Sequence, residues 1–406
     1  MHHQIQWTSV CSKTDHFASV EAFSAETARR TRQFHRSFPQ YRETSLKPLS
    51  GLAWHWKVGG IFVKDESERF GLNAFKVLGG SYAIGRYLAD LCGLPLESLQ
   101  YSQIISKEVK NKIGEITFVT ATDGNHGRGV AWTAAQLGQK SVVYMPKGSS
   151  LTRLDHIREL GSAAEILDCS YDDCVRRAAM QAKQNEWILV QDTSFPGYEE
   201  IPNWIMQGYT TMALEADEQM ERIGERPTHI FLQAGVGSMA AAVVAYFVSK
   251  YGKEIQFFVV EPKTADCMFR SAQEPDGKAH CITQQMNTIM AGLACGEPNP
   301  AAWKILKSYS STFFSCPDWV SANGMRILAA PVKGDEPIIS GESAAVGIGL
   351  LEELMQNRQW GTFRKKIGLN EHSKILFFST EGNTDPQRYQ DIVWHGAFHR
   401  PNNFTK

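Results

Sequence analysis

The chain has 406 residues, 43% of them hydrophobic, which is enough for about two to three domains with a full core. Its 42 lysines and arginines nearly balance its 43 aspartates and glutamates. The sequence therefore has no excess of positive charge that would indicate binding to nucleic acid or to a membrane surface, and a small-molecule partner is favoured. No stretch approaches the roughly 20 apolar residues of a membrane span, and the N-terminus lacks the apolar core of a secretory signal, so we expect a cytoplasmic protein.

A regular alternation of apolar runs and helical patterns begins at residue 116, after an isolated helical pattern over 19–32. The apolar runs predict strands at 116–120, 141–145, 164–167 and 187–190, and the stretches between them predict helices at 125–138, 151–160 and 171–186. Four strands joined by three helical crossovers predict a parallel sheet.

A second alternation starts after Pro196 and predicts a larger α/β unit. Its elements are helices at 199–222, 238–251 and 341–357 and strands at 228–232, 255–260 and 374–378. Between them, residues 262–340 are rich in proline, glycine and asparagine, and we expect connections and short helices that cover a site.

The eight cysteines are scattered and show no C-x-x-C spacing, so we expect no metal site and reduced, packed thiols. Cys267 and Cys295 both fall within residues 262–340. Reduced, packed thiols are the default for this pair as well, and the alternative is that the two approach each other and form a redox-sensitive crosslink.

Lys76 is the first residue that points to chemistry. It lies where a helical pattern begins, in the string Phe75-Lys76-Val77-Leu78-Gly79-Gly80. Burial and a helix N-terminus both favour a neutral amine, which would make this lysine a nucleophile. A solvated surface lysine is the alternative that the residue alone leaves open.

A polar cluster, Thr122-Asp123-Gly124-Asn125-His126-Gly127, follows a predicted strand and opens a helix. Open α/β sheets bind their ligands at the carboxyl ends of such strands. Asp123 and Asn125 are therefore candidates for contacts with a ligand, while we expect His126 to pack or to cap the helix.

A glycine loop, Gly235-Val236-Gly237-Ser238-Met239, joins another strand to a helix and predicts a phosphate cradle of backbone N–H groups. By itself this loop also fits a dinucleotide fingerprint with Glu261 as the ribose ligand, so a nicotinamide-dependent oxidoreductase stays open. Thr380, after the last predicted strand, offers a hydroxyl that suits a pyridine nitrogen.

With these clusters in this order, residues 60–385 resemble the fold type II (tryptophan synthase β-like) pyridoxal-5′-phosphate (PLP) enzymes. The resemblance implies an α/β fold with two open, mostly parallel twisted sheets in a large and a small domain, the PLP site between them, and a homodimer. We expect residues 1–82 and 197–406 to form the large domain and residues 83–196 the small one.

The resemblance also implies roles for particular residues. Lys76 would hold PLP as a Schiff base, Phe75 would flank the ring, and Asn125 would bond the ring 3′-oxygen. Thr380 would face the ring nitrogen. The phosphate would lie in a cradle formed by Gly235, Val236, Gly237, Ser238 and Met239.

Within that superfamily the chain is similar to the diaminopropionate ammonia-lyases, on the strings 75–83, 122–127, 190–193 and 291–297. The similarity implies elimination of ammonia from 2,3-diaminopropionate to give pyruvate and two ammonia; a serine or threonine dehydratase-like lyase is the alternative. Those dehydratases carry a small neutral residue at the position of Asp123, whereas a carboxylate at Asp123 or Asp192 suits the extra ammonium of this substrate.

Stereochemistry separates the roles of the candidate acids. The resemblance implies that Lys76 would lie on one face of the ring and reach the α-proton of the L enantiomer. The D enantiomer would then need a second base, for which Asp123 is the candidate. Asp192 would hold the β-ammonium group. Asp192 also has a structural interpretation as a turn residue or helix cap, and Glu342 as a charge in a helix first turn.

Overall fold

Two open sheets organise the computed structural model, which describes residues 4–11, 17–122 and 124–401. The strands are β1 Gln6–Thr8, β2 Leu46–Pro48, β3 Gly60–Asp65, β4 Thr117–Ala121, β5 Lys140–Met145, β6 Ala163–Ile166, β7 Ile188–Leu189, β8 His229–Gln233, β9 Gln256–Pro262, β10 Thr312–Cys316 and β11 Lys374–Ser379. In the described chain, seven form a sheet in the order β1-β10-β9-β8-β11-β3-β2, and four form a sheet in the order β6-β5-β4-β7.

The strand directions confirm the predicted fold class. All three pairs of the smaller sheet are parallel, as its four predicted strands and three crossovers require. In the larger sheet the inner pairs are parallel, and the antiparallel pairs among the described strands lie at its two edges, β1 with β10 and β2 with β3. The chain is therefore an α/β protein with two mostly parallel sheets.

Helices cover the sheets. They are α1 Ala25–Arg36, α2 Ser50–Trp56, α3 Val77–Cys92, α4 Tyr101–Ile104, α5 Lys107–Ile113, α6 Asn125–Gln136, α7 Leu151–Arg158, α8 Tyr171–Asn185, α9 Glu200–Arg222, α10 Ser238–Tyr251, α11 Cys267–Gln273, α12 Pro300–Tyr309, α13 Asp318–Ala329, α14 Val346–Gln356, α15 Gly361–Lys366 and α16 Pro386–Val393. Short 3-10 turns are η1 Glu21–Phe23, η2 Glu66–Gly71, η3 Leu96–Ser98, η4 Ala291–Leu293 and η5 Arg358–Trp360. Within the described ranges, no helix combines the length and the apolar character that crossing a bilayer requires.

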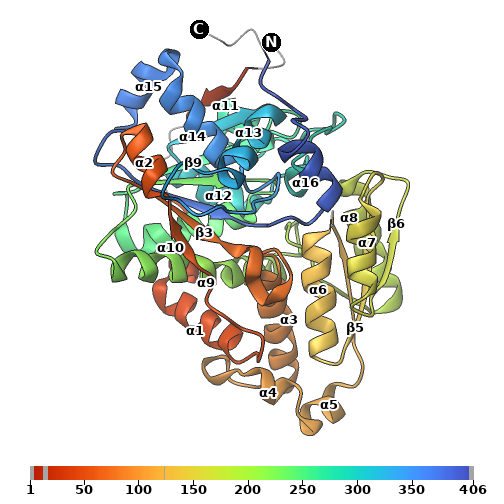
Figure 1. Ribbon diagram of the computed structural model, residues 1–406. Helices are drawn as coiled ribbons and strands as arrows, with labels where there is room; N and C mark the ends of the chain where they lie inside the picture. Colours follow the sequence, from red (N-terminus) through yellow and green to blue (C-terminus); the bar gives the residue numbers. More distant parts are fainter. Residues whose placement is uncertain (1–3, 12–16, 123, 402–406) are drawn as a thin grey trace.

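The larger sheet has a hydrophobic core on each face. One core contains side chains of α1, α3, α9 and α10, and the other contains side chains of α2, α13, α14 and α15. Figure 1 shows α9 and α10 on one side of this sheet and α13 and α14 on the other, while α6, α7 and α8 lie with β5 and β6. Because both faces are covered, strands such as β3, β8 and β10 are buried along their whole length.

Several elements differ from the sequence-based expectations. The helix expected at 19–32 begins at Ala25 and ends at Arg36, and the edge strands β1 and β2 lie where no strand was predicted. Residues 262–340 contribute not only connections but also β10, a strand of the larger sheet, and the helices α12 and α13. The helix expected from residue 341 begins at Val346, because residues 341–345 form a turn whose Ser343 N–H donates to the Glu381 carboxylate. This turn lies beside the site described below.

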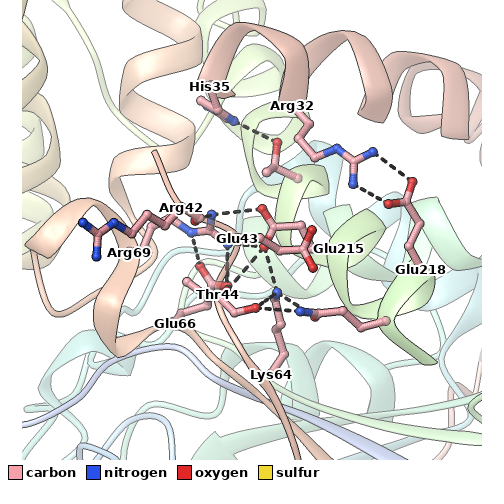
Figure 2. A network of polar contacts seen from close by, with 12 residues as sticks. Arg32, His35, Arg42, Glu43, Thr44, Lys64, Glu66, Arg69, Glu215 and Glu218 are labelled. Atoms are coloured by element: carbon pink, nitrogen blue, oxygen red, sulfur yellow. Dashed lines mark hydrogen bonds and ion pairs between the residues drawn. The ribbon is translucent and has the colours of Figure 1, made fainter. Parts of the chain in front are cut away.

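A buried ionic network anchors the segment that leads to Lys76 (Figure 2). The fully buried Arg69 donates to Glu66 at 2.8 Å and to Glu215 of α9 at 2.6 Å, and Lys64 pairs with the same Glu215 carboxylate at 2.7 Å. Burial opposes ionisation, but the charges of Arg69 and Lys64 hold the pKa of the Glu215 carboxyl well below its usual range. The network therefore fixes β3 and η2 to α9.

We expect Glu215→Gln to lower the free energy of unfolding by about 3–5 kcal/mol, because Arg69 and Lys64 would stay buried without their carboxylate. A depressed folded-state pKa contributes stability that is present above the unfolded value of about 4.3 and is lost as pH falls toward the folded value. Urea unfolding at neutral and acidic pH should therefore show the difference between wild type and variant shrinking in acid.

Glu254→Gln is the matched control, since Glu254 pairs with Arg226 on the surface. Its loss should stay below about 1 kcal/mol. Equal losses in the two variants would contradict a stabilising role for the buried network.

Candidate active site

A cavity of about 220 Å³ opens where the carboxyl ends of strands from both sheets meet. Its lining includes residues that follow β4, β5, β7, β8 and β11. Ligands of open α/β sheets bind at this edge. The structure thus brings Lys76, Asn125, Asp192, Thr380 and the glycine loop to one cavity, as the sequence predicted.

Lys76 stands at the N-cap position of α3, and its side chain is 19% exposed. Its Nζ forms an ion pair with the Asp192 carboxylate and lies 5.7 Å from the centre of the Phe75 ring. Gly129 of α6 lets that helix approach the backbone beside Lys76, because a Cβ there would lie 2.9 Å from the Val77 Cα. The sequence pattern did not reveal this neighbouring carboxylate.

Asp192 follows β7 and is buried. Burial works to raise the pKa of its carboxyl, but the Lys76 ammonium, His126 and the hydrogen bond from Lys76 outweigh burial and lower that pKa to about 2. The Asp192 carbonyl accepts a hydrogen bond from the Ser238 hydroxyl at 2.6 Å. Asp192 is therefore a fixed anion in the cavity, placed in a bend shortly after the end of β7.

The glycine loop links β8 to α10. Gly237 is the N-cap of α10 with φ +90°, and a Cβ there would lie 2.4 Å from the Met268 Cε. The first N–H groups of a helix have no partner inside the helix, so the start of α10 presents donors to the cavity. This geometry suits a phosphate group.

Thr380 follows β11 and is held by Gln233 at the end of β8. The Gln233 amide donates to the Thr380 hydroxyl at 2.7 Å and to the Phe378 carbonyl at 2.9 Å. The Thr380 carbonyl accepts the Phe75 N–H at 3.0 Å, which ties the strand end to the residue beside Lys76. Gln233 therefore positions the hydroxyl, a role that no local pattern in the sequence indicated.

Polar side chains of the two sheets meet across the cavity. The Asn125 amide donates to Glu381 at 2.5 Å, and Arg153 of α7 pairs with Glu342 at 2.9 Å. Burial first, and then the nearby Glu381, raise the pKa of the Glu342 carboxyl to about 7, although Arg153 opposes this. Glu342 thus lies in the cavity wall as the partner of Arg153, and it precedes α14 instead of standing in its first turn.

Four other candidate residues have distinct outcomes. Asp123 lies outside the described residues. The His126 Nε2 lies 2.8 Å from the Val190 carbonyl, so this buried side chain packs as expected. Cys267 and Cys295 are buried free thiols that both lie beside Gly235: the Cys267 Sγ lies 3.7 Å from the Gly235 carbonyl oxygen, and the Cys295 Sγ lies 3.2 Å from where a Cβ of residue 235 would stand. Their crosslink stays a prediction.

Glu261 is not available as a ribose ligand. Its buried carboxylate accepts the N–H groups of Met268 at 2.8 Å and Phe269 at 2.7 Å, and so caps the start of α11. The dinucleotide interpretation of the glycine loop required a free acid at this position. Because Glu261 is occupied in this way, it no longer supports the hypothesis of a nicotinamide-dependent oxidoreductase.

Several lining or supporting residues were missed by sequence reasoning: Arg153, Tyr171, Gln191, Gln233, Asn299 and Glu381. Asn299 shows why, because it is the N-cap of α12 and also donates to the Ser238 hydroxyl at 2.8 Å. Its cap pattern, Asn299 before Pro300, was a readable signal, but its contact with the glycine loop joins distant parts of the chain.

Comparison with known proteins identifies the class to which this site belongs. Residues 38–363 match the family model described as pyridoxal-phosphate dependent enzyme. The chain belongs to that family. Among the described residues, no group of three or more histidine, cysteine, aspartate or glutamate side chains is placed to hold a metal ion.

Particular relatives narrow the comparison to the diaminopropionate ammonia-lyases. The enzyme of that name from Salmonella typhimurium is 51% identical over 382 residues, 93% of this chain and 95% of the relative. The Escherichia coli K12 enzyme is 49% identical over 376 residues, 92% and 93% of the two chains. The crystal structure of the holo enzyme from E. coli has a TM-score of 0.92 and 45% identity over 99% of both chains.

A further structure of the E. coli enzyme carries the aminoacrylate-PLP azomethine reaction intermediate. It has a TM-score of 0.90 and 45% identity, and the match covers 98% of this chain and 99% of that one. The similarity thus spans the whole fold and not only the four sequence clusters.

Proposed function

We propose that this enzyme, a carbon–nitrogen lyase of the PLP-dependent family, eliminates ammonia from 2,3-diaminopropionate and gives pyruvate and two ammonia. The observation that carries the proposal is the pairing of Lys76 with the ionised Asp192 inside a cavity that also holds the glycine loop and Thr380. A lysine beside a fixed anion serves a substrate that brings an extra ammonium group.

The residues of the cavity fit PLP, the cofactor of the family. Lys76 would hold it covalently, Phe75 would flank its ring, and Thr380 would face its ring nitrogen. The N-terminus of α10, with Gly235 and Gly237 lacking side chains, would cradle its phosphate. When bound, PLP supplies an electron sink for the bond broken at the substrate α-carbon.

Asn125 can serve the cofactor without leaving its present partner. Its amide donates one hydrogen to Glu381. An asparagine amide carries two donor hydrogens, so the second is available for the ring 3′-oxygen. Glu381 would then orient Asn125, and the Ser343 N–H in turn orients Glu381 at 3.1 Å.

We assign proton removal from the L enantiomer to the amine of Lys76 and binding of the β-ammonium group to Asp192. With its pKa near 2, Asp192 is ionised throughout the physiological pH range and can pair with either ammonium. Asp123 is assigned from sequence alone as the base for the D enantiomer. A closed, partly desolvated pocket would make an aspartate a stronger base than it is in water.

We further propose a cytoplasmic homodimer with a large domain of residues 1–82 and 197–406 and a small domain of residues 83–196. All strands of the larger described sheet fall in the first two ranges and all strands of the smaller one in the third, which supports this division. Light scattering on the purified holoenzyme tests the dimer.

Lys76→Ala should abolish pyruvate release from 2,3-diaminopropionate, because neither a covalent anchor for the cofactor nor the base for the L enantiomer would remain. Borohydride treatment of the wild type should fix the cofactor to the peptide that contains Lys76. Lys140→Ala, which alters an exposed lysine paired with Glu115, is the control and should keep full activity. Near-normal turnover by Lys76→Ala would refute the assignment.

Gly237→Val should weaken PLP binding by about tenfold or more, a cost of at least about 1.4 kcal/mol, because the side chain would strain a left-handed backbone and collide with Met268. Titration of the apoenzyme with PLP measures the effect. Gly252→Ala at the other end of α10 is the matched control, since it has φ +64° but no atom within 4 Å of the added Cβ. Equal affinities in both variants would remove this loop from the phosphate site.

Asp123→Asn should reduce pyruvate production from D-2,3-diaminopropionate much more than from the L enantiomer, whereas Asp192→Asn should impair both. The reason is that one residue removes a proton from a single face and the other binds a group common to both enantiomers. Assays with each pure enantiomer, and with L-serine and L-threonine as dehydratase substrates, decide the matter. Equal losses for Asp123→Asn would leave it a binding role only.

A further inference from the structure

Two cysteine sulfurs touch at the start of α8. The Sγ atoms of Cys169 and Cys174 lie 3.4 Å apart; Cys169 is half-buried and Cys174 is buried. Ser170 between them is the helix N-cap and accepts the N–H of Asp173. Residues at these two positions, one before the cap and four after it, commonly pack together as an apolar staple.

An apolar staple needs only two hydrophobic side chains, whereas two thiols in contact can also be oxidised. A disulfide bond has an S–S length near 2.05 Å, so the sulfurs need to approach by about 1.4 Å. Cys174 is packed in the core between α8 and the smaller sheet. Most of the movement would therefore fall on Cys169 and the residues next to it.

Tyr171 connects this junction to the candidate active site. It is the first residue of α8 and lines the cavity. Its hydroxyl accepts a hydrogen bond from the Gln191 amide at 2.9 Å and lies 3.5 Å from the Asp192 carboxylate. Gln191 in turn accepts the N–H of Ala121 at the end of β4 at 3.0 Å. A shift of the residues around Cys169 would thus be passed to the anion that pairs with Lys76.

We propose that Cys169 and Cys174 form a peroxide-sensitive thiol pair whose closure to a disulfide lowers the activity of the site through Tyr171. The half-buried Cys169 reacts first: its sulfur takes one oxygen from the peroxide, which leaves as water, and becomes a sulfenic acid. The sulfur of Cys174 then attacks this group, the S–S bond forms and a second water leaves. The sum is two thiols and one peroxide giving one disulfide and two waters.

The order of the two cysteines follows from their surroundings. Burial first, and then the contact with Cys169, raise the pKa of the Cys174 thiol far above its usual range. Thiolates react with peroxide much faster than thiols do, so Cys174 is a poor first target. Its part in the second step rests on its contact with Cys169, because the two sulfurs lie 3.4 Å apart.

Peptide mapping tests the disulfide directly, and its result does not depend on whether the enzyme eliminates ammonia from diaminopropionate. Cleavage after Arg158 and Arg176 by trypsin gives one peptide, residues 159–176, that contains Cys169, Cys174 and no other cysteine. After mild hydrogen peroxide and alkylation of the holoenzyme, this peptide should be unalkylated and lighter by two hydrogen atoms than the reduced peptide. Two alkylated cysteines, or oxygen addition without a disulfide, would overturn the proposal.

The activity measurement rests on the proposed function. Peroxide should lower kcat/KM of the wild type for diaminopropionate by about tenfold, because ångström-scale displacements near reacting groups cost this much or more, and dithiothreitol should restore it. Cys169→Ser and Cys174→Ser should keep basal activity and resist this loss, which also separates the pair from Cys267 and Cys295. Equal losses in wild type and both variants would overturn the proposal.

The variant Tyr171→Phe tests whether Tyr171 transmits the effect of the disulfide to Asp192. This variant lacks the hydroxyl that meets Gln191 and Asp192, so it should form the disulfide normally but lose less activity on oxidation than the wild type loses. A loss as large as that of the wild type would overturn the role of Tyr171. A disulfide in peptide 159–176 with no loss of wild-type activity would overturn the link to the site. No turnover of diaminopropionate at all would count against the proposed function and leave the mapping result unaffected.

Discussion

An ion pair joins the two sheets at the centre of the molecule. Lys76 comes from the segment after β3 of the larger sheet, and Asp192 follows β7 of the smaller one. Removing an ammonium and a carboxylate from water is costly unless each finds the other in good geometry. Both backbones must therefore be held independently before the pair can form, and much of the surrounding structure does this.

The two supports are of different kinds. On the lysine side, Arg69 and Glu215 fix η2 to α9, and the chain then turns through positive φ angles at Phe70, Gly71 and Asn73 before it reaches α3. On the aspartate side, Ser238 and Asn299 bind the Asp192 carbonyl. Because Ser238 also begins α10, the position of the anion and the position of the glycine loop depend on the same residue.

Local patterns in the sequence were sufficient for the smaller sheet and for β8, β9 and β11 of the larger one. The smaller sheet was predicted strand by strand, because its apolar runs alternate with helices of ordinary length. β10 was missed because its five residues, Thr312–Cys316, are a short run inside a region rich in proline and glycine. For the site, motifs located Lys76, Asn125, the glycine loop and Thr380 at one cavity.

What the sequence did not reveal depends on contacts between distant segments. Gln233 reaches Thr380 across 147 positions and Arg153 reaches Glu342 across 189, so no local spacing predicts either pair. For Glu261 the sequence-based prediction was wrong for the opposite reason: a residue that caps the nearby helix α11 matched the position of a ribose ligand.

Arg153 and Glu342 show how a pair of distant residues affects the stability of the cavity wall. The raised pKa of Glu342 means that folding disfavours its charged form, so this carboxyl reduces stability progressively as pH rises from the unfolded value of about 4.3 toward 7. Arg153 limits that cost, and so the wall of the cavity, like its centre, is held by a cation of one sheet unit paired with a carboxyl of the other.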